Sequence, residues 1–185
     1  MLRDEIIAEE GVVPHLYLDT RGNVTCGCGM LISKIGELGR FTWTDFTAAL
    51  NDWSKLQSMK RACEYGKTAP ASRYAPVTRA RMQDPMQGLD DLLASLDGAL
   101  GRRIHGFESW PTCAQEALVD MAWNLGVDGL VKGYPKMLAA CAAGDWSTAA
   151  AECHRNGISD ARNQRTYDRI VSGNTVVGSR PGRGA

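Results

Sequence analysis

Two stretches near the start of the chain carry helical hydrophobic periodicity. Residues 2–10 place apolar side chains among charged ones and precede Gly11, which predicts a short helix that ends at this glycine. Residues 44–62 predict a longer amphipathic helix, because their apolar side chains recur at helical spacing. These apolar positions are Phe46, Leu50, Trp53, Leu56 and Met59.

Between these helices the period changes to that of strands. Residues 15–18 lead into a turn at 19–23, and residues 24–30 alternate strictly, which predicts a small hairpin or sheet. In a strand over 24–30, one face would carry Val24, Cys26, Cys28 and Met30, and the other Thr25, Gly27 and Gly29. The second face is then almost bare, as where another group approaches the backbone closely.

After a loop at 66–76, rich in small residues and proline, helical periodicity resumes. Thr78 is expected to cap a short helix that Pro85 breaks or kinks. Residues 89–104 predict a longer helix, because their leucines form a wide apolar face.

The C-terminal part of the chain predicts a cluster of helices and no strands. Thr112 and Gln115 have the spacing of a capping box, and Gly126 is expected to end the helix that they open. Further helices are expected at 134–143 with Gly144 as stop, at 146–154 with Asp145 as N-cap, and at 160–172 with Ser159 as N-cap and Gly173 as stop. The predicted fold class is therefore α+β and mostly helical, with its sheet near the N-terminus.

Composition and charge exclude several classes of protein. The 185 residues are 44% hydrophobic and 23% charged, which is typical of one globular domain with its own core. Because 21 basic residues balance 21 acidic ones, we expect neither a nucleic acid nor a membrane as partner. No signal peptide or membrane span is recognisable, so we expect synthesis in the cytoplasm without an export signal.

The cysteines and histidines do not have the spacing of a metal site. No C-x-x-C pair occurs, and His15, His105 and His154 are scattered, so we expect neither a metal nor a cofactor. Free thiols are expected in a chain of this length without a signal peptide. The cysteines are Cys26, Cys28, Cys63, Cys113, Cys141 and Cys153.

The residues with most chemical content lie between Glu10 and Leu31. Glu10 ends the first helix, Asp19 opens the turn and Thr25 lies on the returning strand. Two carboxylates and a hydroxyl suit glycosidic bond cleavage, which needs a proton for the leaving oxygen and a carboxylate near the oxocarbenium-like carbon. Acids also occur at helix ends and in turns for structural reasons, so this pattern alone leaves a structural role open.

The same stretch resembles the phage-type (T-even phage) lysozymes, glycoside hydrolase family 24. The resemblance rests on Glu10-Gly11, Tyr17, Asp19-Thr20, Gly22, Thr25, Gly27, Gly29 and Leu31 at the family's spacing. It continues more weakly over 115–126, which resembles the family's central buried helix, and in Trp146 and Arg162. Met30 departs from the family, which usually has a histidine there.

The resemblance implies a lysozyme-like two-lobed fold within a single domain, 1–185. It covers residues 1–35 and 77–172 and makes 36–76 an insertion. The implied parts are an N-terminal lobe at 1–76 that includes the insertion, connecting helices at 77–104 with a long inter-lobe helix, a helical lobe at 105–173 and a loose tail at 174–185.

The resemblance further implies a peptidoglycan muramidase, which hydrolyses the β-1,4 bond between N-acetylmuramic acid and N-acetylglucosamine with inversion. Glu10 would be the general acid, Asp19 the base that works through a water, and Thr25 a residue that helps to hold this water. Leu31 and Trp123 fall where the family lines its cleft from the two lobes. Core packing is an equal interpretation for Trp123.

Two features are not explained by the resemblance. The helix of the insertion, with Trp43, Phe46 and Trp53, is most simply interpreted as packing onto the N-terminal lobe, although an extended cleft or a docking surface stays open. A basic patch near the C-terminus would contact wall carboxylates or cover the last helix. It consists of Arg155, Arg162, Arg165 and Arg169.

Two alternative functions remain. A lytic transglycosylase needs the acid but no base for a water, so Asp19 and Thr25 favour hydrolysis. A non-catalytic wall-binding or tail-structural module is the other alternative. We expect a monomer that binds peptidoglycan glycan strands in the periplasm or on the cell wall. As a phage endolysin it would be released through a holin. As an antibacterial effector it would have an immunity protein as a further partner.

Overall fold

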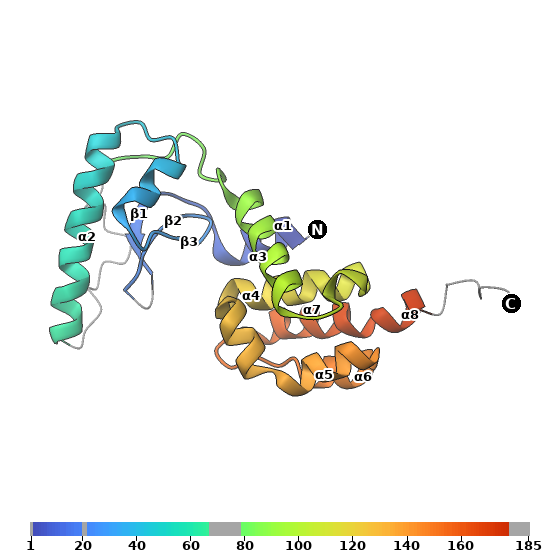
Figure 1. Cartoon of the computed structure of the whole chain (residues 1–185). Helices are drawn as coiled ribbons and strands as arrows, with labels where there is room; N and C mark the ends of the chain where they lie inside the picture. The colour runs from blue at the N-terminus through green and yellow to red at the C-terminus, as the bar shows by residue number, and fades with distance from the viewer. Residues whose placement is uncertain (1, 20–21, 67–78, 178–185) are drawn as a thin grey trace, which may run out of the picture. The chain divides into compact units, whose positions relative to one another are not determined.

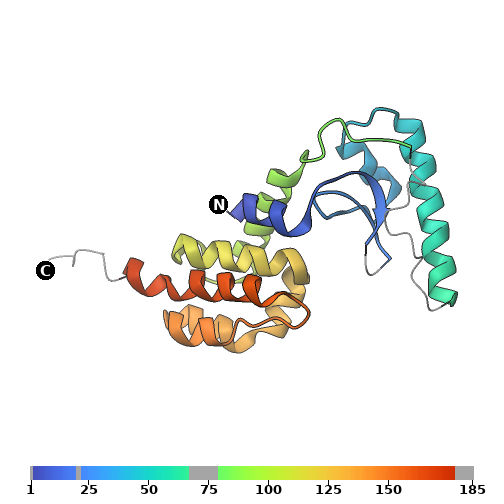
Figure 2. The same cartoon turned by 180° about the vertical axis from the view of Figure 1, so that it is seen from behind.

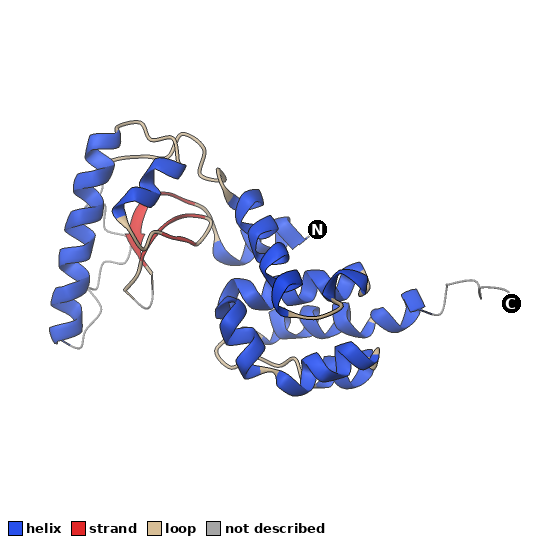
Figure 3. Cartoon of the chain, viewed as in Figure 1, coloured by secondary structure: helices blue, strands red, loops and turns tan. Residues whose placement is uncertain are grey.

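A computed structural model describes residues 2–19, 22–66 and 79–177 of the chain. Helices dominate and the strands are confined to the N-terminal part, which confirms the predicted α+β class (Figures 1 and 3). The chain divides into two compact units, Met1–Asp91 and Leu92–Ala185. The boundary falls in the first turn of α3 (Leu89–Arg103).

The first unit begins with the predicted helix, α1 (Leu2–Glu10), and a three-stranded antiparallel sheet. Gly11 ends α1 with a φ of 70°, and its N–H donates to the Ile7 carbonyl at 3.0 Å. The strands β1 (Val13–Leu18), β2 (Val24–Gly27) and β3 (Met30–Leu31) pair in chain order. Their core face carries the buried side chains of Leu18, Val24, Cys26 and Met30.

The prediction of one strand over 24–30 is wrong. The strand ends at Gly27, and Cys28 and Gly29 form a turn back into β3. Both glycines have positive φ, 58° at Gly27 and 69° at Gly29, which suits a turn and not a strand. The sequence pattern did not reveal this turn, because Cys28 in the turn and Met30 after it are both buried and continue the alternation of β2.

The helix predicted over 44–62 is α2 (Phe46–Gly66), but its buried face differs from the predicted one. Phe46 is 45% exposed, and the buried side chains include Ala49, Asp52 and Leu56. The burial of the Asp52 carboxylate is tolerated because its Oδ2 accepts hydrogen bonds from the backbone N–H groups of Arg79 and Ala80, at 2.7 and 3.0 Å.

This helix packs on the sheet, as expected of the insertion. It contacts β1, β2 and the 3₁₀ helix η1 (Ile35–Arg40). Trp53 Nε1 donates to the Ile32 carbonyl at 3.2 Å, and the buried Trp43 donates from Nε1 to the Leu38 carbonyl at 2.9 Å. Packing is therefore the observed role of Trp43 and Trp53.

The short helix expected to break at Pro85 is absent from residues 79–85, and its proposed cap, Thr78, lies outside the described residues, as does most of the loop at 66–76. Met82 instead forms a β-bridge with Trp43, and its N–H donates to the Pro14 carbonyl at 2.8 Å. The backbone groups of this segment are thus used by the sheet region and not by a helix.

The second unit is helical. Figures 1 and 2 show α4 (Thr112–Gly133) beside α7 (Asp160–Val171), with α5 (Pro135–Ala143) and α6 (Trp146–Ala151) on the other side of α7. A 3₁₀ helix, η2 (Phe107–Ser109), precedes α4 and a short helix, α8 (Gly173–Val177), follows α7. The predicted caps are confirmed, because Asp145 Oδ1 accepts from Thr148 N at 3.0 Å and Ser159 Oγ from Arg162 N at 3.3 Å.

Two predicted helix signals in this unit, the capping box at Thr112 and the stop at Gly173, are wrong or only partly right. Thr112 is the first helical residue after the N-cap Pro111, and Gln115 Nε2 donates to carbonyls of the preceding turn, so no capping box forms. The expectation for Gly126 is confirmed, because this residue is non-helical, with a φ of 71° and a ψ of 158°, and the helix that begins at Thr112 ends there at a kink between two helical segments of α4.

Gly173 begins α8 instead of stopping the chain's last helix, so the expected loose tail is wrong for 174–177, and residues 178–185 lie outside the described part. A Cβ added at Gly173 would lie 2.7 Å from two ring carbons of Trp146. The absence of a side chain at Gly173 therefore allows the Trp146 ring to pack closely on the backbone, whereas the prediction assumed that this glycine ends a helix.

Candidate active site

Glu10 lies at the C-terminal end of α1, where its side chain meets the turn between β2 and β3. Its carboxyl group packs on Gly29, because a Cβ built at Gly29 would be 3.3 Å from Glu10 Oε2. Gly27 is more crowded than Gly29, since a Cβ there would collide with the Pro85 carbonyl oxygen and with the Met30 side chain. Other groups therefore approach these glycines closely, as predicted, but they are the protein's own Pro85, Met30 and Glu10, and Gly29 lies in a turn and not on the strand of Thr25.

Asp19 follows β1 and is held on both carboxylate oxygens by one residue, Asn23. The Asn23 N–H donates to Asp19 Oδ1 at 2.7 Å, and Asn23 Nδ2 donates to Oδ2 at 3.1 Å. In return, Asp19 N–H donates to the Asn23 carbonyl at 2.9 Å. Asn23 thus fixes the orientation of the Asp19 carboxylate.

Thr25 is 3% exposed and its hydroxyl proton is used within the protein. Thr25 Oγ1 donates to the Asn23 carbonyl at 3.1 Å, the same carbonyl that accepts from Asp19. A hydroxyl that donates one bond still has two acceptor lone pairs. Asn23 therefore links the second carboxylate to the hydroxyl.

Leu31 and Tyr17 lie beside Thr25 on the same face of the sheet. Thr25 is paired with Tyr17 on β1 and with Leu31 on β3, and directly opposed residues of antiparallel strands share a face. Leu31 is 51% exposed and Tyr17 is half-buried. Within the first unit, Asn23 thus joins Asp19 to Thr25, and Leu31 lies beside Thr25. Glu10 lies against Gly29, in the turn between β2 and β3.

Sequence reasoning missed Asn23 and gave Tyr17 no role. An Asn four positions after an Asp in a turn is a recognisable signal, because both side chains often bond to nearby backbone groups. Tyr17 is identifiable only through the register of the strands, which the hydrophobic pattern did not supply.

Trp123, the fifth predicted site residue, belongs to the helical unit. It is half-buried on α4, next to Asn124, whose Oδ1 accepts from Arg155 Nη1 at 2.6 Å. The structure describes the two units separately, so the proposed role of Trp123 opposite Leu31 stays a prediction.

The predicted basic patch is wrong for two of its four arginines. Arg155 and Arg162 are buried and both bind Asp120 on α4: Arg155 Nη2 lies 2.8 Å from Oδ2, and Arg162 Nη2 2.8 Å from Oδ1. Thr166 Oγ1 also donates to Asp120 Oδ2, at 3.3 Å. This buried ionic cluster connects α4 and α7 and is not a surface for wall carboxylates.

The ionic cluster sets the charge state of Asp120. Burial alone would raise the pKa of this carboxyl, but the hydrogen bond and charge of Arg162, with those of Arg155, outweigh burial and hold the pKa below its usual value. Asp120 is thus ionised in the folded protein at neutral pH.

The cysteines whose side chains the structure describes show no nucleophilic or metal-binding arrangement. Those that the structure describes are free thiols, and burial raises the pKa of Cys26 and of Cys141 to about 12. Over the described ranges, His, Cys, Asp and Glu side chains form no group of three or more that is placed to hold a metal ion. None of the helices in these ranges combines the length and apolar character of a membrane span.

Comparison with known proteins does not assign the chain to a family. No protein-family model matches the sequence, and a search of curated proteins returned no match.

Proposed function

We propose that the chain is a muramidase of the phage-lysozyme type, which hydrolyses the β-1,4 bond between N-acetylmuramic acid and N-acetylglucosamine in peptidoglycan. The observation that carries the proposal is the Asp19–Asn23 clamp, which holds a second carboxylate beside Thr25 in the unit where Glu10 packs on Gly29. Inverting glycoside hydrolysis needs two carboxyl groups of this kind on one scaffold.

In the proposed reaction the two carboxyl groups have different roles. Glu10 gives its proton to the glycosidic oxygen as the bond to the anomeric carbon breaks. Asp19 accepts a proton from the water that attacks this carbon from the opposite face of the ring, which inverts its configuration. The added water ends as the new anomeric hydroxyl and the proton on Asp19, so the atoms balance.

Thr25 and Asn23 support the water step. Because the Thr25 hydroxyl donates to the Asn23 carbonyl, Thr25 Oγ1 meets a water as an acceptor. A water that donates one hydrogen to Thr25 and the other to Asp19 turns a lone pair toward the sugar. Asn23 aligns both acceptors and is a positioning residue in this scheme.

Substrate contacts are proposed on both units. Exposed Leu31 and half-buried Tyr17 flank Thr25 and offer an apolar surface to a sugar ring. Trp123 is the proposed contact from the lysozyme-like second lobe. The proposed partner is the glycan strand, reached in the periplasm or on the cell wall by holin-dependent release or by injection as an effector with an immunity protein.

The rival activity is that of a lytic transglycosylase, in which the sugar's own hydroxyl attacks the anomeric carbon. That reaction has no use for a second carboxylate held on both oxygens, so the Asn23 clamp favours hydrolysis. A non-catalytic module would need neither Glu10 nor Asp19.

The test compares lysis by the parent chain with lysis by Glu10→Gln, using turbidity of purified walls and release of reducing ends. The amide keeps the shape but cannot give a proton, and general acid catalysis is worth about 10²–10⁴-fold. Glu9→Gln, at an exposed position of the same helix, is the matched control and should lyse walls at the parent rate. Equal rates for Glu10→Gln and the parent would overturn the proposal.

A further inference from the structure

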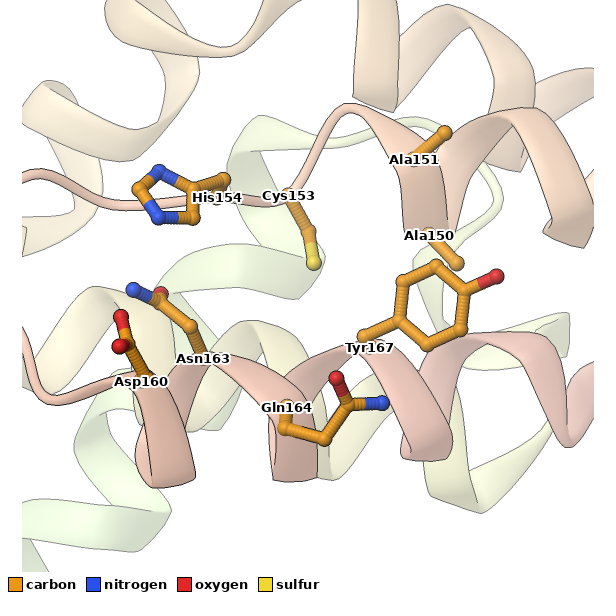
Figure 4. Close-up of a pocket in the computed structure, with 8 residues that line it drawn as sticks. All are labelled: Ala150, Ala151, Cys153, His154, Asp160, Asn163, Gln164 and Tyr167. Atoms are coloured by element: carbon orange, nitrogen blue, oxygen red, sulfur yellow. The ribbon is translucent and has the colours of Figure 1, made fainter.

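A pocket of about 320 Å³ lies in the helical unit, between α7 and the segment that follows α6. In Figure 4 the side chains of Asp160, Asn163, Gln164 and Tyr167 line it from α7, and Cys153 points into it from the opposite wall. Its size is at the lower end of small-molecule sites, which suits a single ring and not a folded peptide.

The pocket wall is held in place by a two-point clamp. Asn163 Oδ1 accepts the Arg155 N–H at 3.1 Å, and Asn163 Nδ2 donates to the Arg155 carbonyl at 2.9 Å. Arg155 is itself anchored on Asp120. Residues 153–155 are therefore fixed against α7 before any ligand binds.

Three polar side chains on the rim have no hydrogen-bond partner in the described part of the chain. They are the imidazole of His154, the carboxyl group of Asp160 and the hydroxyl of Tyr167, all on exposed residues. By contrast, Gln164 Nε2 already donates to Asp168 Oδ1 at 2.8 Å. The rim thus offers an acid, an imidazole and a phenol to a ligand.

The floor and the charge of the pocket narrow the class of ligand. Ala150 and Cys153 are buried, and burial raises the pKa of the Cys153 thiol, so the floor is apolar and uncharged at neutral pH. No Lys or Arg side chain lines the pocket, whereas Asp160 does. A phosphate or carboxylate ligand would have no fixed cationic partner here.

We propose that this pocket binds one N-acetylhexosamine ring of a glycan chain without cleaving it. The apolar face of the sugar lies on Tyr167, which is 39% exposed, and the hydroxyl groups bond to Asp160 and His154. The methyl of the N-acetyl group packs on Ala150 and Cys153. The proposal rests on the proposed function only for naming peptidoglycan as the source of the glycan.

The experiment is a residue-resolved NMR titration of Glu10→Gln with the β-1,4-linked trimer of N-acetylglucosamine. We expect shifts of the backbone amides of residues 150–154 and 160–167, separate from any shifts in residues 10–31. Replacing Tyr167 with Ala should weaken binding at 150–167 about fivefold, because stacking on an aromatic ring is worth on the order of 1 kcal/mol.

Control variants distinguish the loss of a contact in the pocket from a general effect of the substitution on the protein. Asp160→Asn should weaken the same shifts severalfold, whereas Asp97→Asn, the same change at an exposed site on α3, should leave them unchanged. Saturating trimer without shifts at 150–167, or a dissociation constant for these shifts that Tyr167→Ala leaves unchanged, would overturn the proposal. So would shifts at 150–167 that lysine amide produces and the trimer does not, because the pocket would then bind an amine.

The outcome is independent of catalysis. A chain that shows these shifts but releases no reducing ends from walls would uphold the sugar pocket and overturn the proposed muramidase. A chain that hydrolyses walls but shows no amide shifts at residues 150–167 would uphold the proposed muramidase and overturn the sugar pocket.

Discussion

The carboxyl group of Glu10 lies directly against the backbone of Gly29, so closely that a Cβ at Gly29 would be 3.3 Å from Oε2. Such a distance is shorter than that of most real Cβ contacts, and Gly29 also has a φ of 69°, which L side chains rarely adopt. The turn between β2 and β3 thus determines where the proposed acid stands.

Gly29→Ala is expected to impair both stability and activity. The left-handed backbone should cost about 1–2 kcal/mol in the free energy of unfolding. The new methyl should also displace the Glu10 carboxyl, and a displacement of about 1 Å at a reacting group can cost about 10²-fold in rate. Urea unfolding and the rate of wall hydrolysis measure the two effects.

Gly144→Ala is the matched control for this variant. Gly144 has a φ of 72° at the end of α5, and a Cβ there would meet nothing within 4 Å. It should therefore lose similar stability and keep the parent rate. If both variants keep the parent rate, Gly29 does not position the acid.

Asn23→Ala should lower kcat on wall fragments about tenfold with little change in KM. The substitution removes the 3.1 Å bond from Nδ2 to Asp19 Oδ2 and leaves the backbone bond to Oδ1, so Asp19 is less well fixed. Hydrogen bonds to charged groups are worth about 1.5–3 kcal/mol, which is the basis of the expected factor.

Asn174→Ala is the control for Asn23→Ala, because its Nδ2 makes a bond of equal length, 3.1 Å, to Ser147 Oγ in the other unit. It should leave kcat unchanged. A rise in KM at constant kcat in Asn23→Ala would indicate a substrate contact and contradict the positioning role.

Thr25→Val should fold but lose most of its hydrolytic activity, whereas Thr25→Ser should keep a large part of it. Valine keeps the shape of threonine but has no acceptor for the water, and serine retains the hydroxyl that donates to the Asn23 carbonyl. Circular dichroism checks the fold and reducing-end release checks the activity. Equal activity of the two variants would show that Thr25 only stabilises the strand.

Asp120→Asn should destabilise the helical unit by about 3–5 kcal/mol, because it leaves two buried arginines without their counter-charge. The pKa of Asp120 is lowered in the folded state, so its stabilisation is complete above the unfolded pKa of about 3.9 and is lost as the pH falls through the folded pKa. Urea unfolding from pH 7 to pH 3 should show less acid dependence in the variant than in the parent.

Asp128→Asn is the control for burial. The pair Arg103–Asp128 has the same N···O distance of 2.8 Å, but its side chains are 51% and 71% exposed. The expected loss is about 0–1 kcal/mol. A similar loss in both variants would mean that burial of the Asp120 cluster contributes nothing.

Features that depend on neighbouring residues were predictable from the sequence. Gly11 and Gly144 end helices, and Asp145 and Ser159 cap them, because each acts within one helical turn. Gly173 was misread as a stop because its role depends on contact with Trp146, which lies on a different helix.

The residue types of the candidate site were predictable from the sequence, but the hydrogen bonds and ion pairs between the residues were not. Glu10, Asp19 and Thr25 stand out by chemistry and spacing, whereas the direction of the Asn23 amide is a property of the folded turn. Arg155 and Arg162 were expected on the surface, as most arginines are, but their partner Asp120 lies 35 and 42 positions away in the sequence. Such pairing depends on how α4 and α7 pack.

The most direct test of the proposed muramidase is mass spectrometry of the fragments that the chain releases from purified peptidoglycan. The account predicts fragments with a reducing-end N-acetylmuramic acid from the parent chain and none from Glu10→Gln or Asp19→Asn. Fragments that end in 1,6-anhydro-N-acetylmuramic acid would identify a lytic transglycosylase and contradict the assignment of Asp19 as the base, and the absence of any fragments would contradict catalysis itself.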